Sequence, residues 1–436
     1  MAPKKTPAEA ADTAPKTEKA PVEKAAKKAP VEKAMSPLDR ASASLKKILE
    51  TDHTVPLSAD MTKITMPHLT TGAVTVDYLI GGRPNIYGVP PCPGWPCGRI
   101  SNLYGNSGAG KTTLALTTAA KVCASGGTVC YIDWENEVEP RYAAALGVPI
   151  GDQSRFKLYQ PETLEDGMKI MVQMALSGVD LIVVDSVGAG VPSKVYHRDN
   201  KEEGDQIRPG LMAQLWGQFL PKFKSVISKS NTTVIGISQM RKTLNTMGGG
   251  GPDSAPQGGE AWKFYSAVRM MLRVYQKQKT KKMNGITGKM EEMVTGTIVV
   301  AKLDKCKVSD SAFQEQMFYL RSGTGIDNSK SIVDLAVNYG VITKRGSWHD
   351  WHTAPNGTIT GNGMESFLAK LQEDPNNLTL LFAQVAPRLG SVGAPILAPS
   401  EDENDVAAED LDDIFSIVPG MEKVQAAPPE DEPDLS

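Results

Sequence analysis

Short apolar runs alternate with longer helical patterns through the middle of the chain. Between residues 100 and 320 the apolar runs of strand length are RISNLY, TVCYIDW, DLIVVD, TTVIGIS and TGTIVVAKL. Apolar residues at helical spacing fill the intervals at 111–124, 162–177 and 210–229. This alternation is typical of a mostly parallel sheet with helices on its faces, so we predict an α/β fold.

The pattern changes at both ends of this region. The first 34 residues contain almost no large apolar side chain and repeat APVEKA, which predicts disorder. A short amphipathic helix is expected next, from Leu45, Ile48 and Leu49. After about residue 325, SIVDLAVNYGVI and GMESFLAKLQ indicate a small separate domain that is rich in helix. The aromatic segment WHDW, which begins at Trp348, is expected with the following His352 to pack its core through His349, Trp351 and His352; a metal or stacking role is the alternative.

These changes divide the chain into five expected segments. They are a disordered Lys/Ala/Pro-rich tail at 1–35, an N-terminal helix and strand segment at 36–75, a large core at 76–322, a small α/β C-terminal domain at 323–395 and an acidic disordered tail at 396–436. A chain of 436 residues is long enough for one large domain and a smaller one.

The net charge of −3 conceals a strong asymmetry. Residues 1–34 contain eight lysines and five acids, for +3, whereas residues 401–436 contain thirteen acids and one lysine, for −12. The total of −3 therefore leaves +6 for residues 35–400. A basic body with an acidic tail indicates a polyanionic partner and a tail that competes for the same surface. The alternative is that both tails only increase solubility.

The five cysteines are scattered along the chain, at Cys92, Cys97, Cys123, Cys130 and Cys306. Cys92 and Cys97 have a CxxxxC spacing, but no nearby CxxC or His pair supplies the two further ligands of a metal site. No apolar signal segment begins the chain, and no run of about 18 apolar residues could span a bilayer. We therefore expect a soluble protein of a reducing compartment.

The segment GNSGAGKTT fits the pattern G-x-x-x-x-G-K-[ST] between a predicted strand at 100–104 and a predicted helix that begins at Lys111. In this context the glycines let backbone N–H groups surround a phosphate. Lys111 would reach the terminal phosphates and Thr112 would ligate Mg²⁺. The expected ATP-binding residues of this loop are Gly105, Asn106, Ser107, Gly108, Ala109, Gly110, Lys111, Thr112 and Thr113.

Two acidic residues follow other strands of the predicted sheet. The run LIVVDS places Asp185 at the carboxyl edge, where a carboxylate would complete the Mg²⁺ site with Thr112. Glu135 in YIDWENEVEP lies just beyond another strand end and is the candidate that orients or deprotonates water. The alternative for Glu135 is an ordinary cap of the helix that begins near Pro140.

Together these segments resemble one family, the bacterial and phage RecA-like recombinases. The similar segments are GNSGAGKTT, YIDWENEVEPRYAAALGV, LIVVDSVGAGVPS, GISQMR, GGEAWKFYSAVR and DKCKVSDSAFQ, in the same order and at similar spacing. SIVDLAVNYGVI, GSWHDW and GNGMESFLAKL resemble the C-terminal domain of that family, so the resemblance covers about residues 40–385. It implies a RecA-like P-loop ATPase core at 76–322 and a role in polymerisation for 36–75.

The resemblance implies nucleotide roles for particular residues. Glu135 would activate the attacking water, and Gln239, at the end of the fourth strand, would sense the γ-phosphate. Tyr142, with Glu139 beside it, would pack against the adenine. The expected catalytic residues are Glu135, Lys111, Gln239, Lys305 and Lys307.

Lys305 and Lys307 resemble the paired lysines that reach the ATP of the neighbouring subunit. A basic pair stabilises charge on a transferring phosphate, and supplying it from a second protomer would couple hydrolysis to assembly. Lys263 and Phe264 would lie at that subunit interface. From the residues alone, the alternative for the lysine pair is a solvated strand edge, since lysine commonly protects such edges.

Two segments without regular periodicity resemble the DNA-binding loops of the family. The first is HRDNKEEGDQIRPG at 197–210, and the second lies between Gln239 and the segment GGEAWKFY. Basic residues would follow the DNA backbone and apolar residues would insert between bases. The candidate DNA contacts are Arg198, Lys201, Ile207, Arg208, Arg241, Lys242, Leu244, Met247, Gly258 and Gly259.

We therefore predict an ATP- and Mg²⁺-dependent protein of homologous recombination and DNA repair. The resemblance implies a helical filament on single-stranded DNA, homologous pairing and strand exchange with duplex DNA, and DNA-stimulated ATP hydrolysis. Single-strand-binding and mediator proteins would be further partners, and the location would be the cytoplasm of a bacterium or of the host of a phage. Two alternatives stay open: a ring-forming RecA-fold DNA helicase, and an ATP-binding recombination mediator.

Overall fold

A computed structural model describes residues 37–49, 65–83, 90–196, 210–242, 254–256, 259–283, 290–312 and 314–389. The chain divides into two units, Met1–Ser58 and Ala59–Ser436. The described part of the first unit is helix α1 (Pro37–Leu49), where the amphipathic pattern around Leu45 predicts a helix. The two tails predicted to be disordered, at 1–35 and 396–436, lie outside the described residues.

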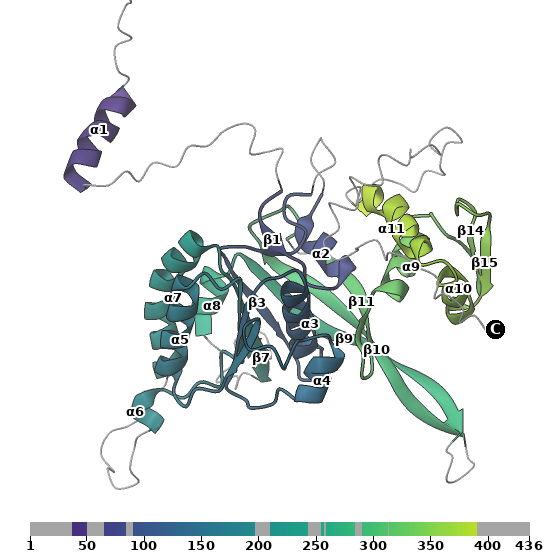
Figure 1. Cartoon of the computed structure of the whole chain (residues 1–436), viewed down its shortest axis with the longest axis horizontal. Helices are drawn as coiled ribbons and strands as arrows, with labels where there is room; N and C mark the ends of the chain where they lie inside the picture. The colour runs from purple at the N-terminus through teal and green to yellow at the C-terminus, as the bar shows by residue number, and fades with distance from the viewer. Residues whose placement is uncertain are drawn as a thin grey trace, which may run out of the picture. The chain divides into compact units, whose positions relative to one another are not determined.

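The second unit is built around one large sheet (Figure 1), whose strands are ordered β12-β11-β10-β9-β3-β7-β6-β4-β5. The parallel strands are β9 (Val268–Met283), β3 (Ile100–Gly105), β7 (Thr233–Lys242), β6 (Leu181–Asp185), β4 (Val129–Asp133) and β5 (Phe156–Tyr159). The antiparallel strands are β10 (Met290–Cys306), β11 (Glu315–Arg321) and β12 (Gly325–Asp327). The predicted α/β fold with a mostly parallel sheet is confirmed.

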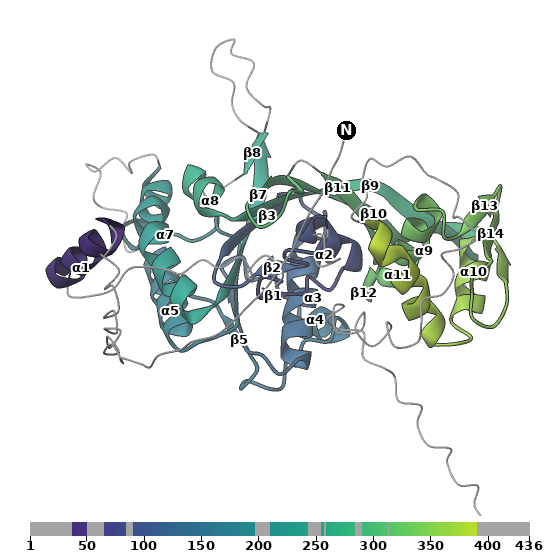
Figure 2. The same ribbon diagram turned by 90° about the horizontal axis from the view of Figure 1, so that it is seen from above.

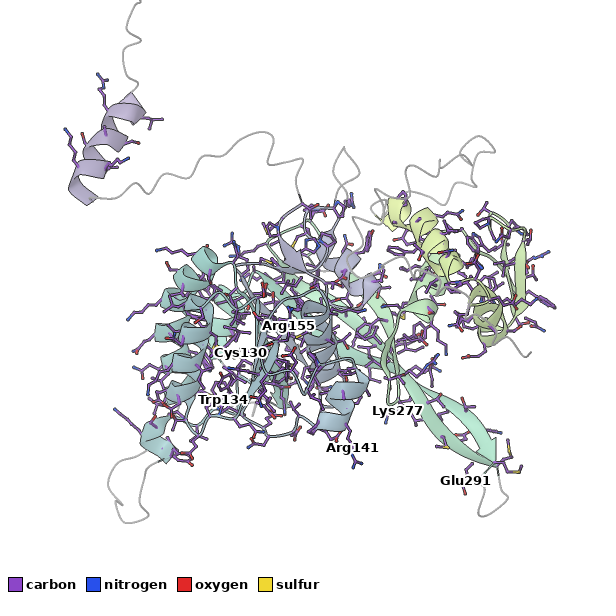
Figure 3. All side chains as sticks on the ribbon, in the orientation of Figure 1. Cys130, Trp134, Arg141, Arg155, Lys277 and Glu291 are labelled. Carbon is purple, nitrogen blue, oxygen red and sulfur yellow. The ribbon has the colours of Figure 1, made fainter. Side chains whose placement is uncertain are left out.

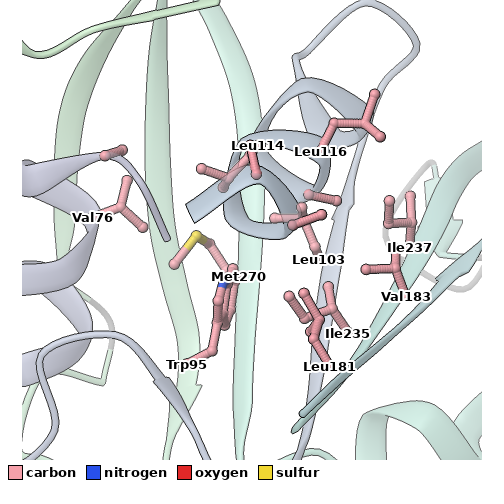
Figure 4. Packing of buried hydrophobic residues seen from close by; sticks show 14 of the residues in the cluster. Val76, Trp95, Leu103, Leu114, Leu116, Leu181, Val183, Ile235, Ile237 and Met270 are labelled. Carbon is pink, nitrogen blue, oxygen red and sulfur yellow. The ribbon is translucent and has the colours of Figure 1, made fainter. Parts of the chain in front are cut away.

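Helices cover both faces of this sheet, as Figure 2 shows. The helices on one face are α2 (Val74–Gly81) and α3 (Lys111–Ala124), and those on the other are α5 (Leu164–Leu176), α7 (Leu211–Ser230) and α8 (Gly259–Tyr265). Successive side chains of a strand point to opposite faces. In β6, Val183 therefore packs on the α3 side (Figure 4) and Val184 on the α7 side. Burial on both faces explains why the central strands are continuously apolar.

The C-terminal region has its own hydrophobic cluster, formed by apolar residues between 332 and 386 together with Val74 and Tyr78 of α2. Its elements are α9 (Asn328–Asn338), β13 (Thr343–Arg345), β14 (Trp348–Trp351), β15 (Ile359–Asn362), α10 (Met364–Leu371) and α11 (Asn376–Leu389). The side chains of His349 and Trp351 are buried in this region, which confirms the core interpretation of WHDW for these two residues. That interpretation is wrong for His352, which is exposed, and for Trp348, which is 47% exposed.

Four short elements connect this framework. They are β1 (His68–Leu69), β2 (Trp95–Pro96), α4 (Pro140–Ala145) and α6 (Ser193–Tyr196). No helix in the described part of the chain is both long and apolar enough to cross a membrane.

Two strand predictions need correction. Gln239 is not the end of its strand, because β7 continues to Lys242 and pairs with the short strand β8 (Ser254–Pro256). The predicted strand TGTIVVAKL covers only part of β10, which pairs with a β9 of similar length. In both cases backbone pairing extends the strand through residues that lack a continuous apolar pattern.

Candidate nucleotide-binding site

The loop between β3 and α3 has the backbone conformation of an anion-binding turn. Gly108 and Gly110 have φ values of +73° and +85°, in the left-handed region that favours glycine. A Cβ atom at position 110 would also lie 2.4 Å from a methyl carbon of Leu320, so a side chain there would displace Leu320. Helix α3 begins directly after this loop, so its free N–H groups and its dipole face the loop.

Lys111 is held inside the loop that precedes it. Its ammonium donates to the carbonyl oxygens of Gly105 at 3.0 Å and Asn106 at 2.9 Å. Burial lowers the pKa of Lys111, while the carboxylates of Asp185 and Glu135 act in the opposite direction. The charge therefore lies within the loop, where it can exchange carbonyl oxygens for phosphate oxygens.

Asp185 lies at the carboxyl end of β6, beside the first turn of α3. Its Oδ2 atom accepts hydrogen bonds from the hydroxyls of Thr112 and Tyr131, both at 2.8 Å. Burial raises the pKa of Asp185 to about 6, against the effect of these two hydrogen bonds. The Thr112 hydroxyl and the Asp185 carboxylate are hard oxygen ligands on neighbouring elements, so the donor set fits Mg²⁺.

Glu135 makes long-range contacts that its position beyond β4 does not predict. Both of its carboxylate oxygens accept hydrogen bonds from Nε2 of Gln239, at 2.8 Å each. The Ser186 hydroxyl donates to Oε1 at 2.5 Å. The helix-cap alternative for Glu135 is therefore wrong. Glu139 is the cap of α4, because its carboxylate accepts from the backbone N–H groups of Arg141 and Tyr142.

The remaining expected nucleotide residues border the same loop. The Tyr142 hydroxyl and the Thr113 hydroxyl form a 2.8 Å hydrogen bond that joins α4 to α3. The structure thus brings together the segment Gly105–Thr113 with Glu135, Asp185, Gln239 and Tyr142 along the carboxyl edge of the parallel strands. Figure 3 shows the wider setting of this edge, with Trp134 after β4 and Arg141 on α4.

Lys305 and Lys307 lie elsewhere on the sheet. Strand register places Lys305 opposite Arg269, and Arg269 opposite Asn102, whereas the nucleotide loop leaves β3 after Gly105. The lysine pair is therefore toward the amino end of β3. Among the described residues, no hydrogen bond or ion pair joins it to the nucleotide loop.

The Lys305 ammonium is bound to the last turn of α8. It donates to the carbonyl oxygens of Lys263 at 3.0 Å and Phe264 at 2.8 Å, where a cation is favourable at a helix C-terminus. Burial lowers the pKa of Lys305, and the nearby cations, Lys307 foremost, add to this effect. The alternative of a solvated edge lysine therefore does not hold for Lys305. Phe264 itself is 70% exposed, as a contact surface requires.

Most of the candidate DNA contacts lie outside the described residues. These are Arg198, Lys201, Ile207, Arg208, Leu244, Met247 and Gly258. Arg241 and Lys242 belong to β7, only a few residues beyond Gln239 along the same strand. Gly259 begins α8 with a φ of +77°, and a Cβ atom there would lie 2.8 Å from the Cβ atom of Ala213. The glycine is therefore needed for the packing of α8 against α7.

Three residues of this site were not predicted from the sequence. Tyr131 and Ser186 donate to the two central carboxylates, and buried Asp133 accepts from the backbone N–H groups of residues 137 and 138. Ser186 directly follows Asp185 in LIVVDS, which was an available signal. Tyr131 and Asp133 belong to the apolar strand β4, on either side of Ile132. Only the pairing of β4 with β6 reveals that they lie beside Asp185.

Comparison with known proteins finds a matching family model and similar sequences. The family model for the RecA N-terminal domain matches residues 38–327. Protein RecA of Thermus aquaticus is 35% identical over 347 residues, which cover 79% of this chain and 92% of that protein. Protein RecA of Staphylococcus aureus strain Newman is 35% identical over 325 residues, covering 73% and 83% respectively. A crystal structure of the RadB recombinase aligns with a TM-score of 0.40 at 21% identity, over 59% of this chain and 98% of that chain.

Proposed function

The chain belongs to the RecA family, and we propose that it is a recombinase that binds ATP, Mg²⁺ and DNA and hydrolyses ATP when bound to DNA. The observation that supports this most is the convergence of Lys111, Asp185 and the Glu135–Gln239 pair on one sheet edge beside an anion-binding loop. These groups match the tasks of phosphoryl transfer, which are to bind phosphates, hold a cation and orient water.

In this proposal each group at the edge has a separate task. Backbone N–H groups of the loop hold the ATP phosphates, and the Lys111 ammonium turns from the carbonyl oxygens of Gly105 and Asn106 to the terminal phosphates. Thr112 and Asp185 hold Mg²⁺, which neutralises part of the phosphate charge when bound. Tyr142, on α4, packs against the adenine, with Glu139 beside it.

Glu135 accepts the proton of the attacking water in this scheme. Gln239 on β7 and Ser186, directly after β6, hold its carboxylate, so the base is oriented before ATP binds. A phosphate oxygen near Gln239 would compete for the same amide N–H groups. A change in the hydrogen bonds of Gln239 on nucleotide binding is therefore transmitted along β7 to Arg241, Lys242 and the segment that follows them.

We propose that a second protomer completes the site. Lys305 and Lys307 are displaced from the nucleotide loop of their own chain, so they are available to a neighbour. Lys263 and exposed Phe264 would form part of the same contact. Repetition of one head-to-tail contact generates a helical filament if the rotation does not close. Such a filament on single-stranded DNA would support pairing and strand exchange with duplex DNA.

Electron microscopy of the full chain with ATP, Mg²⁺ and single-stranded DNA tests this function. We expect helical filaments, and we expect Lys111→Ala to abolish the ATP-dependent form. Normal filaments from the variant would contradict the nucleotide assignment. A strand-exchange assay with homologous and heterologous duplexes completes the test, because unwinding by closed rings without a requirement for homology would indicate a helicase instead.

A further inference from the structure

Strand β10 contains one extra residue opposite β9, at Asp304. Leu303 pairs with Met270 and Lys305 pairs with Arg269, so Asp304 has no partner of its own on β9. Such a β-bulge changes the face to which the following side chains point. Strict alternation from Leu303 would place Lys305 in the hydrophobic core, where Leu303 and Met270 lie. The bulge instead places Lys305 opposite Arg269, on the face of the sheet where α8 lies.

The Asp304 side chain joins three neighbouring strands. Its carboxylate accepts a hydrogen bond from the Tyr104 hydroxyl of β3 and forms a 3.8 Å ion pair with Arg269 of β9. The Arg269 guanidinium also lies over the Tyr104 ring, 4.3 Å from its centre, in a cation–π contact. The side chains of Arg269 and Asp304 are only 13% and 29% exposed, so solvent and salt screen their attraction weakly. Arg269 is therefore held against the sheet.

This arrangement keeps two cations apart. Burial lowers the pKa of Lys305, and the positive charges of Lys307 and Arg269 lower it further. The Lys305 ammonium occupies two carbonyl oxygens at the end of α8, which are also suitable acceptors for a guanidinium. Among the described residues, Asp304 is the one acid in an ion pair with Arg269. Without this carboxylate, we expect Arg269 to turn toward the same carbonyl oxygens and to displace or repel Lys305.

We propose that Asp304 is a positioning residue for the lysine pair. It fixes Arg269 against Tyr104, so that Lys305 alone occupies the end of α8, from which it can move to the nucleotide of a second protomer. Asp304 itself contacts neither ATP nor the reacting atoms. This inference rests on the proposed function, because it concerns the lysines that would complete the neighbouring site.

The rate of ATP hydrolysis by the full chain with single-stranded DNA tests this role. Asp304→Asn keeps the size of the side chain and an acceptor for the Tyr104 hydroxyl, but it removes the charge that holds Arg269. We expect kcat to fall by about 10- to 10²-fold, the scale on which misplacement of a catalytic group lowers a rate. KM for ATP should stay unchanged, because the lysine pair acts on charge that develops on the transferring phosphate. Asp304→Glu restores a carboxylate and should recover hydrolysis.

Glu315→Gln is the matched control. Glu315 also binds an arginine of β9, since it forms a 3.3 Å ion pair with Arg273. Within the described part of the chain, no hydrogen bond or ion pair joins Glu315 or Arg273 to α8 or to the lysine pair. This variant should hydrolyse ATP at the wild-type rate. A loss confined to Asp304→Asn is then not a general consequence of breaking an ion pair of the sheet.

Mixed filaments separate positioning from a purely structural role. Asp304→Asn retains its own Glu135, whereas Glu135→Gln retains a correctly placed lysine pair, so hydrolysis should increase when the two variants are mixed. A mixture of Asp304→Asn with the double variant Lys305→Ala, Lys307→Ala should show no increase, because no protomer then supplies that pair. A variant that had lost its fold would recover hydrolysis in neither mixture.

Three outcomes would overturn the positioning role: wild-type kcat in Asp304→Asn, no recovery with Glu135→Gln, or recovery with the double lysine variant. The double lysine variant on its own distinguishes this failure from that of the proposed function. If it hydrolyses ATP at the wild-type rate, the shared site and the inference are both wrong. If it is inactive while Asp304→Asn has the wild-type kcat, the inference alone is wrong.

Discussion

The nucleotide edge is the carboxyl edge of the parallel strands beside residues 105–113, and the arm is the two-stranded ribbon formed by residues 277–283 of β9 and 290–294 of β10. Both belong to the same sheet, but their polar groups differ in how they are bound. At the edge, the carboxylates of Asp185 and Glu135 and the ammonium of Lys111 are each bound by protein groups. On the arm, Lys277 and Lys281 face solvent and form no ion pair with described residues. Chemistry on a phosphate needs groups oriented in advance. Lysines on an exposed strand ribbon need no such orientation, since they remain hydrated.

The Lys305 site is intermediate between these two. Its ammonium is bound, like the groups at the nucleotide edge, but only by two carbonyl oxygens at the end of a short helix. Phe264 beside it is exposed, like the arm. This combination suits a group that leaves one partner and takes another when a second protomer binds.

Replacing Glu135, the proposed base at the nucleotide edge, should have the largest effect on ATP hydrolysis. Glu135→Gln keeps the size of the side chain but cannot accept a proton, so ATP hydrolysis should fall by about 10²- to 10⁴-fold. ATP binding should persist, as measured by equilibrium binding of a fluorescent nucleotide. Glu137→Gln, on the exposed side of the same loop, is the control and should hydrolyse ATP at the wild-type rate. Substantial hydrolysis by Glu135→Gln would mean that another group is the base.

Replacing Lys305 and Lys307 with alanine should have the next largest effect. Loss of charge stabilisation at the phosphate should lower hydrolysis by about 10²- to 10³-fold, with ATP binding by the isolated protomer unchanged. Mixing this variant with Glu135→Gln sharpens the test, because some interfaces then join an intact Glu135 to intact lysines. Hydrolysis should reappear in the mixture. A mixture as inactive as its two components would contradict a site shared between protomers.

A buried group that shapes the nucleotide edge should have a moderate effect on stability. Asp133→Ala removes the acceptor of the backbone N–H groups of residues 137 and 138, so the free energy of unfolding should fall by about 1 to 3 kcal/mol. Urea unfolding followed by circular dichroism measures this change. A loss well below this range would mean that water replaces the carboxylate without penalty.

The smallest effect is expected on the arm. Lys279→Ala removes an ion pair whose two side chains are both more than half exposed, so the free energy of unfolding should change by less than about 0.5 kcal/mol. The same urea titration measures it. A loss comparable to that of Asp133→Ala would show that the arm is part of the structural framework, and the contrast between the two regions would fail.

The sequence predicted where most residues of this edge lie in the fold because their signals are local. The glycine spacing of residues 105–113 and the apolar run before Asp185 each specify a turn or a strand end within a few residues. The partners of Glu135 are not local, since Gln239 is 104 positions away and meets it only after the sheet forms. The family resemblance gave Glu135 and Gln239 separate expected roles, but their contact was not predicted, because it depends on the strand order.

The individual strands of the arm and of the C-terminal α/β domain were not predicted, for a different reason. Both faces of the arm are exposed, so its strands have no apolar alternation to detect. Strands β13 to β15 are only three or four residues long, and their pairing is set by contacts with α10 and with each other. Strands that are short or fully solvated therefore cannot be predicted from the alternation of apolar and polar residues.

The most direct test of the central proposal is the rate of ATP hydrolysis by the full chain, with and without single-stranded DNA. We predict a low rate without DNA that rises with DNA concentration and then saturates, with the rise abolished in Glu135→Gln. The same rate with and without DNA, or a DNA-dependent rise that survives in Glu135→Gln, would contradict a DNA-dependent ATPase at this sheet edge.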